Sequence, residues 1–264
     1  MKITPIKLLC LVSVLSIPVA SLNAAQVVDW TGNAGDGLWT TGSNWAGSVT
    51  SDVAPATGDT VNIATGSIVN TFGLAPVGIV PAATINLSGS STLTTGGDTI
   101  RLAGCTVNVG SGSILTGGFW DLSGGNVNFK NGAIANMGSW QQKGLNTISF
   151  ELGTTGFTTL TPSTFYIGDS GFANIINATY NVDMAAYTGG IGLITLMDFS
   201  TAPVMTNADF QTASLNILNS SGYTANLLWN ETDKSIQLDV TAVPEPGTVA
   251  LLGLGGLAML RRRR

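Results

Sequence analysis

The sequence predicts an all-β chain whose body is a parallel β-helix, or β-solenoid, and three observations point to this fold class. Charged residues are only 9% of the chain, and its apolar residues fall mostly in short alternating runs. Glycine-rich corners separate these runs. The runs recur at intervals of 24, 22, 20 and 21 residues, counted between their first apolar residues Val61, Ile85, Val107, Val127 and Ile148. Such spacing suits a solenoid rung, which buries its apolar face only by stacking.

The same spacing predicts which side chains face outward. If Ile85 and Leu87 point into the core, the intervening Asn86 points out. Equivalent positions of successive rungs then form one exposed column, made of Asn62, Asn86, Asn108 and Asn128. Stacked asparagine side chains can hydrogen-bond along such a column. Two interpretations stay open, a ladder that only stiffens the solenoid and a polar strip for glycan hydroxyls.

Further columns follow from the same count. Positions eight residues after a rung start are Leu93, Leu115 and Ala135, and positions fifteen residues after it are Ile100, Leu122 and Gln142. Trp120 and Trp140 each lie thirteen residues after a rung start, and Asp98 has the equivalent place one rung earlier. The two tryptophans are therefore expected to stack on successive rungs. They either fill a corner of the core or form an exposed platform for sugar rings.

The repeats are assigned to residues 58–177, and residues 26–57 before them are rich in tryptophan. Trp30, Trp39 and Trp45 lie there among Gly, Asn and Thr. The first rung of a solenoid has an open edge and an open core, so we interpret this segment as an N-terminal cap. Its tryptophan pattern resembles the start of autotransporter-type β-helical proteins.

Residues 178–242 lose the clean period but keep strand-like runs. The predicted strands are 179–182, 192–197, 215–218, 224–229 and 235–240. A hairpin turn is expected over 230–233, before the strictly alternating last run. We expect a β-rich C-terminal section packed on the end of the solenoid.

The charge of the body excludes one class of partner. Between the two apolar ends of the chain lie four basic and fourteen acidic residues, a net charge of −10. Phosphate binding depends on clustered Lys and Arg side chains. Nucleic acid is therefore not expected as a partner.

The residues that catalysis would need are sparse. The chain has no histidine, so Cys105 has no histidine base to activate it. Glycoside hydrolysis needs two facing carboxylates, and only Asp98 and Asp121 lie in nearly aligned columns. A lyase would need a basic side chain near bound calcium, and Arg101 stands alone. We expect no catalytic residue, no cofactor and no metal site.

The first 25 residues have the features of a secretory signal peptide with a helical apolar core. Lys2 and Lys7 provide the positive start, and an apolar run over 8–20 follows. This run is short for a membrane span. We expect export through the Sec translocon and cleavage by signal peptidase, which would also remove Cys10.

Residues 243–264 combine three elements in order. A Pro-Glu-Pro segment that cannot continue a strand or helix is followed by a short apolar, glycine-rich stretch and then by basic residues. The residues of this motif are Pro244, Glu245, Pro246, Arg261, Arg262, Arg263 and Arg264. The order resembles the PEP-CTERM sorting signal. The resemblance implies that the apolar helix anchors the chain transiently in the membrane, and that an exosortase-type membrane protease cuts near Pro-Glu-Pro.

These observations predict a non-catalytic exported protein of the cell surface or extracellular matrix, structural or adhesive in the exopolysaccharide layer. Exopolysaccharide is then its expected partner outside the cell. One alternative is a glycan-binding module that uses Trp120 and Trp140. A second alternative is a polysaccharide-degrading β-helix enzyme.

Overall fold

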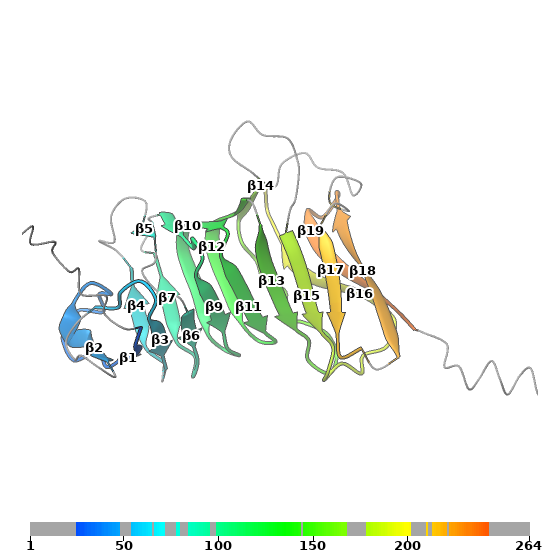
Figure 1. Cartoon of the computed structure of the whole chain (residues 1–264). Coiled ribbons are helices and arrows are strands. Elements are labelled where there is room, and N and C mark those ends of the chain that lie inside the picture. The colour runs from blue at the N-terminus through cyan, green and yellow to red at the C-terminus, as the bar shows by residue number, and fades with distance from the viewer. Residues whose placement is uncertain are drawn as a thin grey trace, which may run out of the picture.

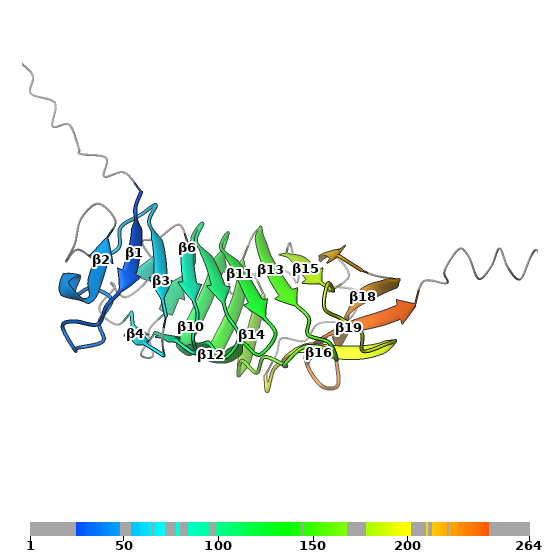
Figure 2. The ribbon, with the colours of Figure 1, turned by 90° about the horizontal axis from the view of Figure 1, so that it is seen from below.

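The structure, a computed structural model, is an elongated stack of strands that runs from a tryptophan-rich end to a three-stranded sheet (Figure 1). It describes residues 25–47, 54–64, 66–71, 78–79, 84–95, 99–143, 145–167, 178–201, 210, 213–220 and 222–242. Two long sheets face each other along the stack, as the view in Figure 2 shows. The predicted β-solenoid body is thereby confirmed.

One wall of the solenoid is a sheet of nine strands within the described residues. In spatial order they are β17 (Ser214–Leu218), β15 (Ala178–Asp183), β13 (Asn146–Glu151), β11 (Asn126–Lys130), β9 (Thr106–Val109), β6 (Thr84–Leu87), β3 (Thr60–Ile63), β1 (Val27–Trp30) and β2 (Trp45–Gly47). All neighbouring pairs are parallel except β1 with β2. The five predicted rung starts lie opposite one another in this sheet, as the spacing required.

The facing wall is a parallel sheet of seven strands among the described residues. They are β4 (Ile68–Asn70), β5 (Gly78–Ile79), β7 (Thr92–Thr94), β8 (Thr99–Arg101), β10 (Ile114–Ser123), β12 (Ile134–Lys143) and β14 (Thr164–Ile167). Leu115 on β10 lies opposite both Leu93 and Ala135, so the predicted eighth-position column is confirmed.

The predicted fifteenth-position column is confirmed for Leu122 and Gln142, which lie opposite each other, but it is wrong for Ile100. Ile100 lies opposite Trp120 rather than Leu122, and Trp120 lies opposite Trp140. The rung that starts at Ile85 has 22 residues and the next has 20, so two extra residues precede Ile100 and shift the column. Asp98, expected to precede the tryptophans in their column, is outside the described residues.

The core lies between the two walls and is built from inward-facing aliphatic and aromatic side chains. Val61, Val107 and Val127 line it from one sheet, and Leu93 and Leu115 line it from the other. Outward positions of β3, β9 and β11 are half-buried or exposed, so burial alternates along these strands as predicted. The repeat of apolar positions in the sequence therefore produces one continuous core along the stack.

The N-terminal end of the stack is covered by the tryptophan-rich segment. Trp39 and Trp45 are fully buried, and the Trp45 ring packs edge-on against Trp39 and Trp30 with centroids 4.9 and 4.8 Å apart. The Trp45 indole N–H donates to the Trp39 carbonyl at 2.8 Å. The short 3-10 helix η1 (Gly42–Asn44) leads into β2. This packing is what a cap over the first rung requires.

The C-terminal end is a three-stranded antiparallel sheet in the order β16 (Gly192–Asp198), β19 (Ser235–Ala242) and β18 (Tyr223–Asn230). The turn predicted at 230–233 joins β18 to β19. Strands β15 and β17, by contrast, continue the solenoid sheet beyond the predicted limit at residue 177. Their period is hidden because longer connections separate them from the earlier rungs.

The two expected end helices lie outside the described residues, at 1–24 and 243–264. Within the part that the structure describes, no helix has the length and apolar character needed to cross a bilayer.

Candidate functional site

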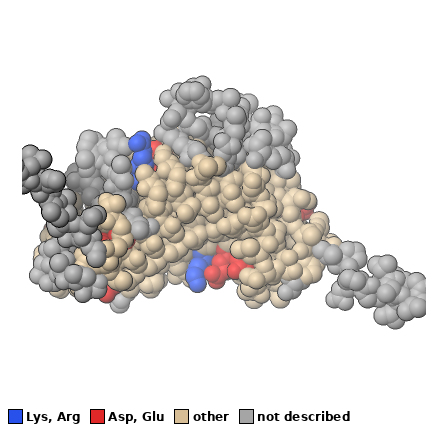
Figure 3. Space-filling model, in the orientation of Figure 1, with Lys and Arg blue, Asp and Glu red and all other residues tan. Residues whose placement is uncertain are grey.

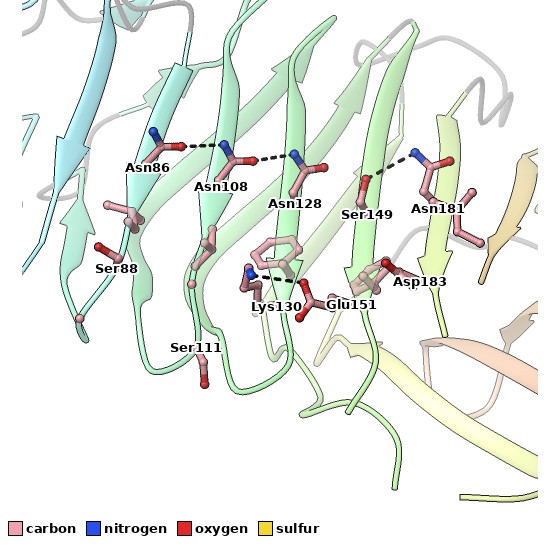
Figure 4. Close-up of a pocket in the computed structure, with 17 residues that line it drawn as sticks. Asn86, Ser88, Asn108, Ser111, Asn128, Lys130, Ser149, Glu151, Asn181 and Asp183 are labelled. Atoms are coloured by element: carbon pink, nitrogen blue, oxygen red, sulfur yellow. Dashed lines mark hydrogen bonds and ion pairs between the residues drawn. The ribbon is translucent and has the colours of Figure 1, made fainter. Parts of the chain in front are cut away.

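The outer face of the nine-stranded sheet carries a groove of about 590 Å³ (Figure 4). Strands β6, β9, β11, β13, β15 and β17 contribute to it, together with the corners that follow β6 and β9. The groove therefore crosses successive rungs and follows the long axis of the solenoid. Its surroundings carry few charges, as the largely uncharged surface in Figure 3 shows.

An asparagine ladder forms one side of the groove. Each amide donates to the asparagine of the preceding rung: Asn86 to Asn62 at 2.8 Å, Asn108 to Asn86 at 2.7 Å and Asn128 to Asn108 at 2.7 Å. The predicted asparagine column is confirmed, and Figure 4 shows part of it. Stacked parallel strands with identical outward residues bring the amides within hydrogen-bonding distance at every rung.

The column of outward polar residues continues past the four predicted members in both directions. Asn62 donates to the Asp29 carboxylate at 2.8 Å at the N-terminal end. Towards the C-terminal end, Asn181 donates to the Ser149 hydroxyl at 3.5 Å, and Asn216 donates to Asn181 at 3.0 Å. Sequence reasoning missed these later members, although Ser149 and Asn181 follow inward residues of their strands by one position.

A second outward row runs beside the ladder and carries the charges of the groove. Lys130 and Glu151 form an ion pair at 3.4 Å, with both side chains more than half exposed. Asp183 accepts from the Ala185 backbone N–H at 2.9 Å and from Asn219 at 3.0 Å. Exposed ion pairs contribute little to stability, so this pair matters more for the local charge than for the fold.

Trp120 and Trp140 are placed differently from the exposed platform considered above. Both rings are 0% exposed and lie within the core on β10 and β12. Inward alternation puts them there, and their indole nitrogens have no hydrogen-bond partner among the described residues. The hypothesis of glycan contact through Trp120 and Trp140 is therefore wrong, and the alternative of core packing is confirmed.

Two other aromatic residues reach the surface of the facing wall instead. Phe119 is half-buried and Tyr166 is 45% exposed, and their ring centroids lie 5.8 Å apart. Phe119 directly precedes the inward Trp120 on β10, so alternation turns its ring outward.

Two charged residues considered for catalysis, Asp121 and Arg101, are engaged in structural contacts. Asp121 is 1% exposed, and its carboxylate accepts from Arg101 at 3.1 Å and from Ser123 at 2.6 Å. Arg101 was expected to stand alone, but the structure pairs it with the Asp121 carboxylate. Asp98 is not described, so its predicted alignment with Asp121 is not tested. Among the described residues, no group of three or more His, Cys, Asp or Glu side chains could hold a metal ion.

Cys105 is buried immediately before β9, and burial raises the pKa of its thiol to about 12. The thiolate is the reactive form, so this thiol is held in its unreactive state. The thiol therefore acts as a small apolar side chain of the core.

The predicted sorting residues, Pro244, Glu245, Pro246 and Arg261 to Arg264, lie outside the described residues. Residues 242–264 match the family described as the PEP-CTERM protein-sorting motif. No curated protein and no solved structure matches the chain. The motif implies export, membrane anchoring through the tail before cleavage, and processing by exosortase, a membrane protease. The chain therefore carries a PEP-CTERM sorting motif at residues 242–264, joined to a β-solenoid body.

Proposed function

We propose that the protein is a non-catalytic component of the cell surface or extracellular matrix, with a structural or adhesive role in the exopolysaccharide layer. The observation that carries this proposal is the sorting motif at residues 242–264 joined to a solenoid body. The motif gives a route to the outside, and the solenoid gives a stiff unit whose nine-stranded sheet carries a regular row of asparagine side chains.

The physical properties of the body support a structural role. Each rung hydrogen-bonds to its neighbours along two walls, and the core is continuous from the tryptophan cluster to the terminal sheet. Such stacks derive stability from nearest-neighbour interfaces between rungs. The sorting motif directly follows β19, the last strand of the body.

The proposed route is tested with the full chain, tagged once in the hairpin turn at 231–234 and once after Arg264. The chain is expressed in an exosortase-encoding strain and in its exosortase deletion. We expect the first strain to place the body outside the cell without the tail tag. The deletion strain should keep both tags in the membrane fraction.

A variant of the motif isolates the contribution of the tail. Glu245→Ala should retain the tail tag in the membrane fraction, whereas the matched acidic control Asp239→Ala should be processed like the parent chain. A parent chain found intact in the cytosol, with its first 25 residues uncleaved, would overturn the proposal.

The role in the layer is tested by deletion of the gene. We expect the mutant to form exopolysaccharide of unchanged amount but with weaker cohesion, measured by release of polysaccharide under shear. Complementation with the parent chain should restore cohesion. A matrix of unchanged mechanical strength would argue against a structural or adhesive role while leaving the export route intact.

A further inference from the structure

We propose that the groove beside the asparagine ladder binds an extended, uncharged polysaccharide chain laid along the axis of the solenoid. This inference rests on the proposed function, which places the body among polysaccharides outside the cell. It assigns the binding to the outer face of the nine-stranded sheet and not to the buried Trp120 and Trp140.

The ladder leaves hydrogen-bonding capacity unused at every rung. A primary amide has two N–H donors and a carbonyl oxygen with two lone pairs. Asn86 and Asn108 each use one donor towards the preceding rung and one lone pair towards the next. One donor and one acceptor per amide remain for a ligand, and both side chains are half-buried rather than covered. A sugar hydroxyl can both donate and accept a hydrogen bond, so it matches the free donor and the free acceptor of each amide.

The repeat of the site suits a polymer rather than a small molecule. Neighbouring strands are about 4.8 Å apart, so the amides form a row with this period along the groove. The row continues across β6, β9 and β11, and the groove extends to β17. A ligand with hydroxyls repeated along its length can contact several rungs at once, which compensates for weak individual contacts.

The shape of the groove leaves this row accessible. Gly110 lies in the second row between Ser88 and Lys130 and has no side chain, so the groove stays open beside Asn108. A methyl group at Gly110 would lie 2.7 Å from the Leu87 carbonyl oxygen, too close for van der Waals contact. The close approach of the Leu87 backbone therefore requires glycine at position 110, and the missing side chain leaves the groove open beside Asn108.

The charges of the groove select against anionic polymers. The positive charge of Lys130 is paired with Glu151, and Asp183 adds a further negative charge on the adjacent strand. The body as a whole carries four basic and fourteen acidic residues between its apolar ends. A polyuronate would meet repulsion from this field, whereas a neutral glycan would not.

The proposal is tested by affinity electrophoresis of the full chain in mild detergent through gels containing a linear β-glucan, a galactomannan or polygalacturonate. We expect at least one neutral polymer to retard the chain, with less than about a twofold change in affinity between low and high salt. Polygalacturonate should cause no specific retardation. Retardation by polygalacturonate that Lys130→Gln abolishes would overturn the choice of a neutral ligand.

A groove-blocking variant assigns the binding to this face. Ser88 is exposed, lines the groove and is not a ladder residue, so Ser88→Tyr should fill the groove without removing an amide. We expect it to weaken binding at least about tenfold, a loss of about 1.4 kcal/mol. Asn226→Tyr, at an exposed position of β18 away from the groove, is the matched control and should bind like the parent.

Two results would overturn the inference. One is the failure of every neutral polymer to retard the parent chain, and the other is equal binding by Ser88→Tyr and Asn226→Tyr. Neither result touches the proposed function if the tail is still cleaved by exosortase and the body is still found outside the cell. Failure of that processing would instead count against the proposed function.

Discussion

The side-chain amide of Asn62 donates to the carboxylate of Asp29 at 2.8 Å, and this contact orients the row of amides from Asn62 to Asn128. A carboxylate can only accept, so Asn62 must present its N–H groups to Asp29 and its oxygen to the next rung. The same orientation then passes to Asn86, Asn108 and Asn128. Aligned amides polarise one another, so one terminal charge orders a row that spans several rungs.

The contribution of the ladder to stability is tested at its middle. Asn108→Ala removes two hydrogen bonds, one to Asn86 and one from Asn128. The flanking amides are half-buried and can turn to water, so we expect a loss of about 1–2 kcal/mol. Chemical denaturation measures this loss. Asn226→Ala on β18 is the control, and equal stability of the two variants would show that the ladder contributes nothing.

The buried tryptophans predict a different pattern of effects. Trp120 is fully buried, and its indole N–H has no partner among the described residues. Trp120→Ala should cost about 3–5 kcal/mol through the cavity that it leaves. Trp120→Phe keeps most of the volume and removes the unpaired N–H, so it should cost far less. Thermal unfolding compares the stability of the two variants. Equal losses of stability would contradict the view that Trp120 acts by filling the core.

Much of the solenoid could be predicted from the sequence because a stacked rung repeats its own pattern. The spacing predicts one column that contains Val61 and Val127, and the strand register confirms it. The ion pair of Lys130 with Glu151 was equally accessible, since each lies three residues after its rung start. The two residues are 21 positions apart in the sequence, so only a comparison of equivalent positions on neighbouring rungs reveals the pair.

The predicted alignment of columns failed where the number of residues per rung changes. Two extra residues before Ile100 moved it opposite Trp120, so a column extrapolated from Ile85 failed within one rung. Burial of Trp120 also could not be read from spacing alone. Spacing shows which residues share a column. Whether that column faces the core or the solvent depends on where each strand begins, and thus on whether the preceding corner has an odd or even number of residues.

The corners of the rungs predict a contrast between two glycines. A methyl group at Gly125 would collide with the backbone carbonyl oxygen of Leu102 on the preceding rung, although Gly125 needs no left-handed conformation. Gly104 has φ of +73° and open space around it. Gly104→Ala should cost about 1–2 kcal/mol from backbone strain.

Gly125→Ala should cost about 3 kcal/mol or more, because the two rungs must move apart to admit the methyl group. Thermal unfolding of both variants measures the contrast. A Gly125→Ala variant as stable as Gly104→Ala would mean that the corner is not close-packed against Leu102.

The buried thiol predicts a pattern of chemical reactivity. Burial raises the pKa of Cys105 to about 12, so the native thiol stays protonated between pH 7 and 9. In the Cys10→Ser background, a disulfide reagent at pH 8 should leave Cys105 unmodified in the folded chain and modify it fully in denaturant. Rapid modification of the native chain would show that the start of β9 opens on the timescale of the reaction.

The loop between Trp30 and Trp39 predicts a pH dependence of stability that is set by Asp36. Its carboxylate accepts from the Thr41 hydroxyl, the Leu38 N–H and the Asn44 amide, and these hydrogen bonds lower the pKa of Asp36 below its usual value. Because the folded pKa lies below the unfolded one, the stabilising effect is complete above about pH 4. It is lost as the pH falls further, through the folded pKa.

The titration of Asp36 is followed by carboxyl NMR in the folded chain, beside thermal unfolding from pH 2 to 7. The hydrogen bond from Thr41 is the largest cause of the shift, so Thr41→Val should move the pKa of Asp36 upward towards its ordinary value. Asp36→Asn should destabilise the chain at pH 7, and its difference from the parent should shrink below about pH 4. A difference that stayed constant down to pH 2 would mean that the Asp36 carboxylate does not hold this loop through its charge.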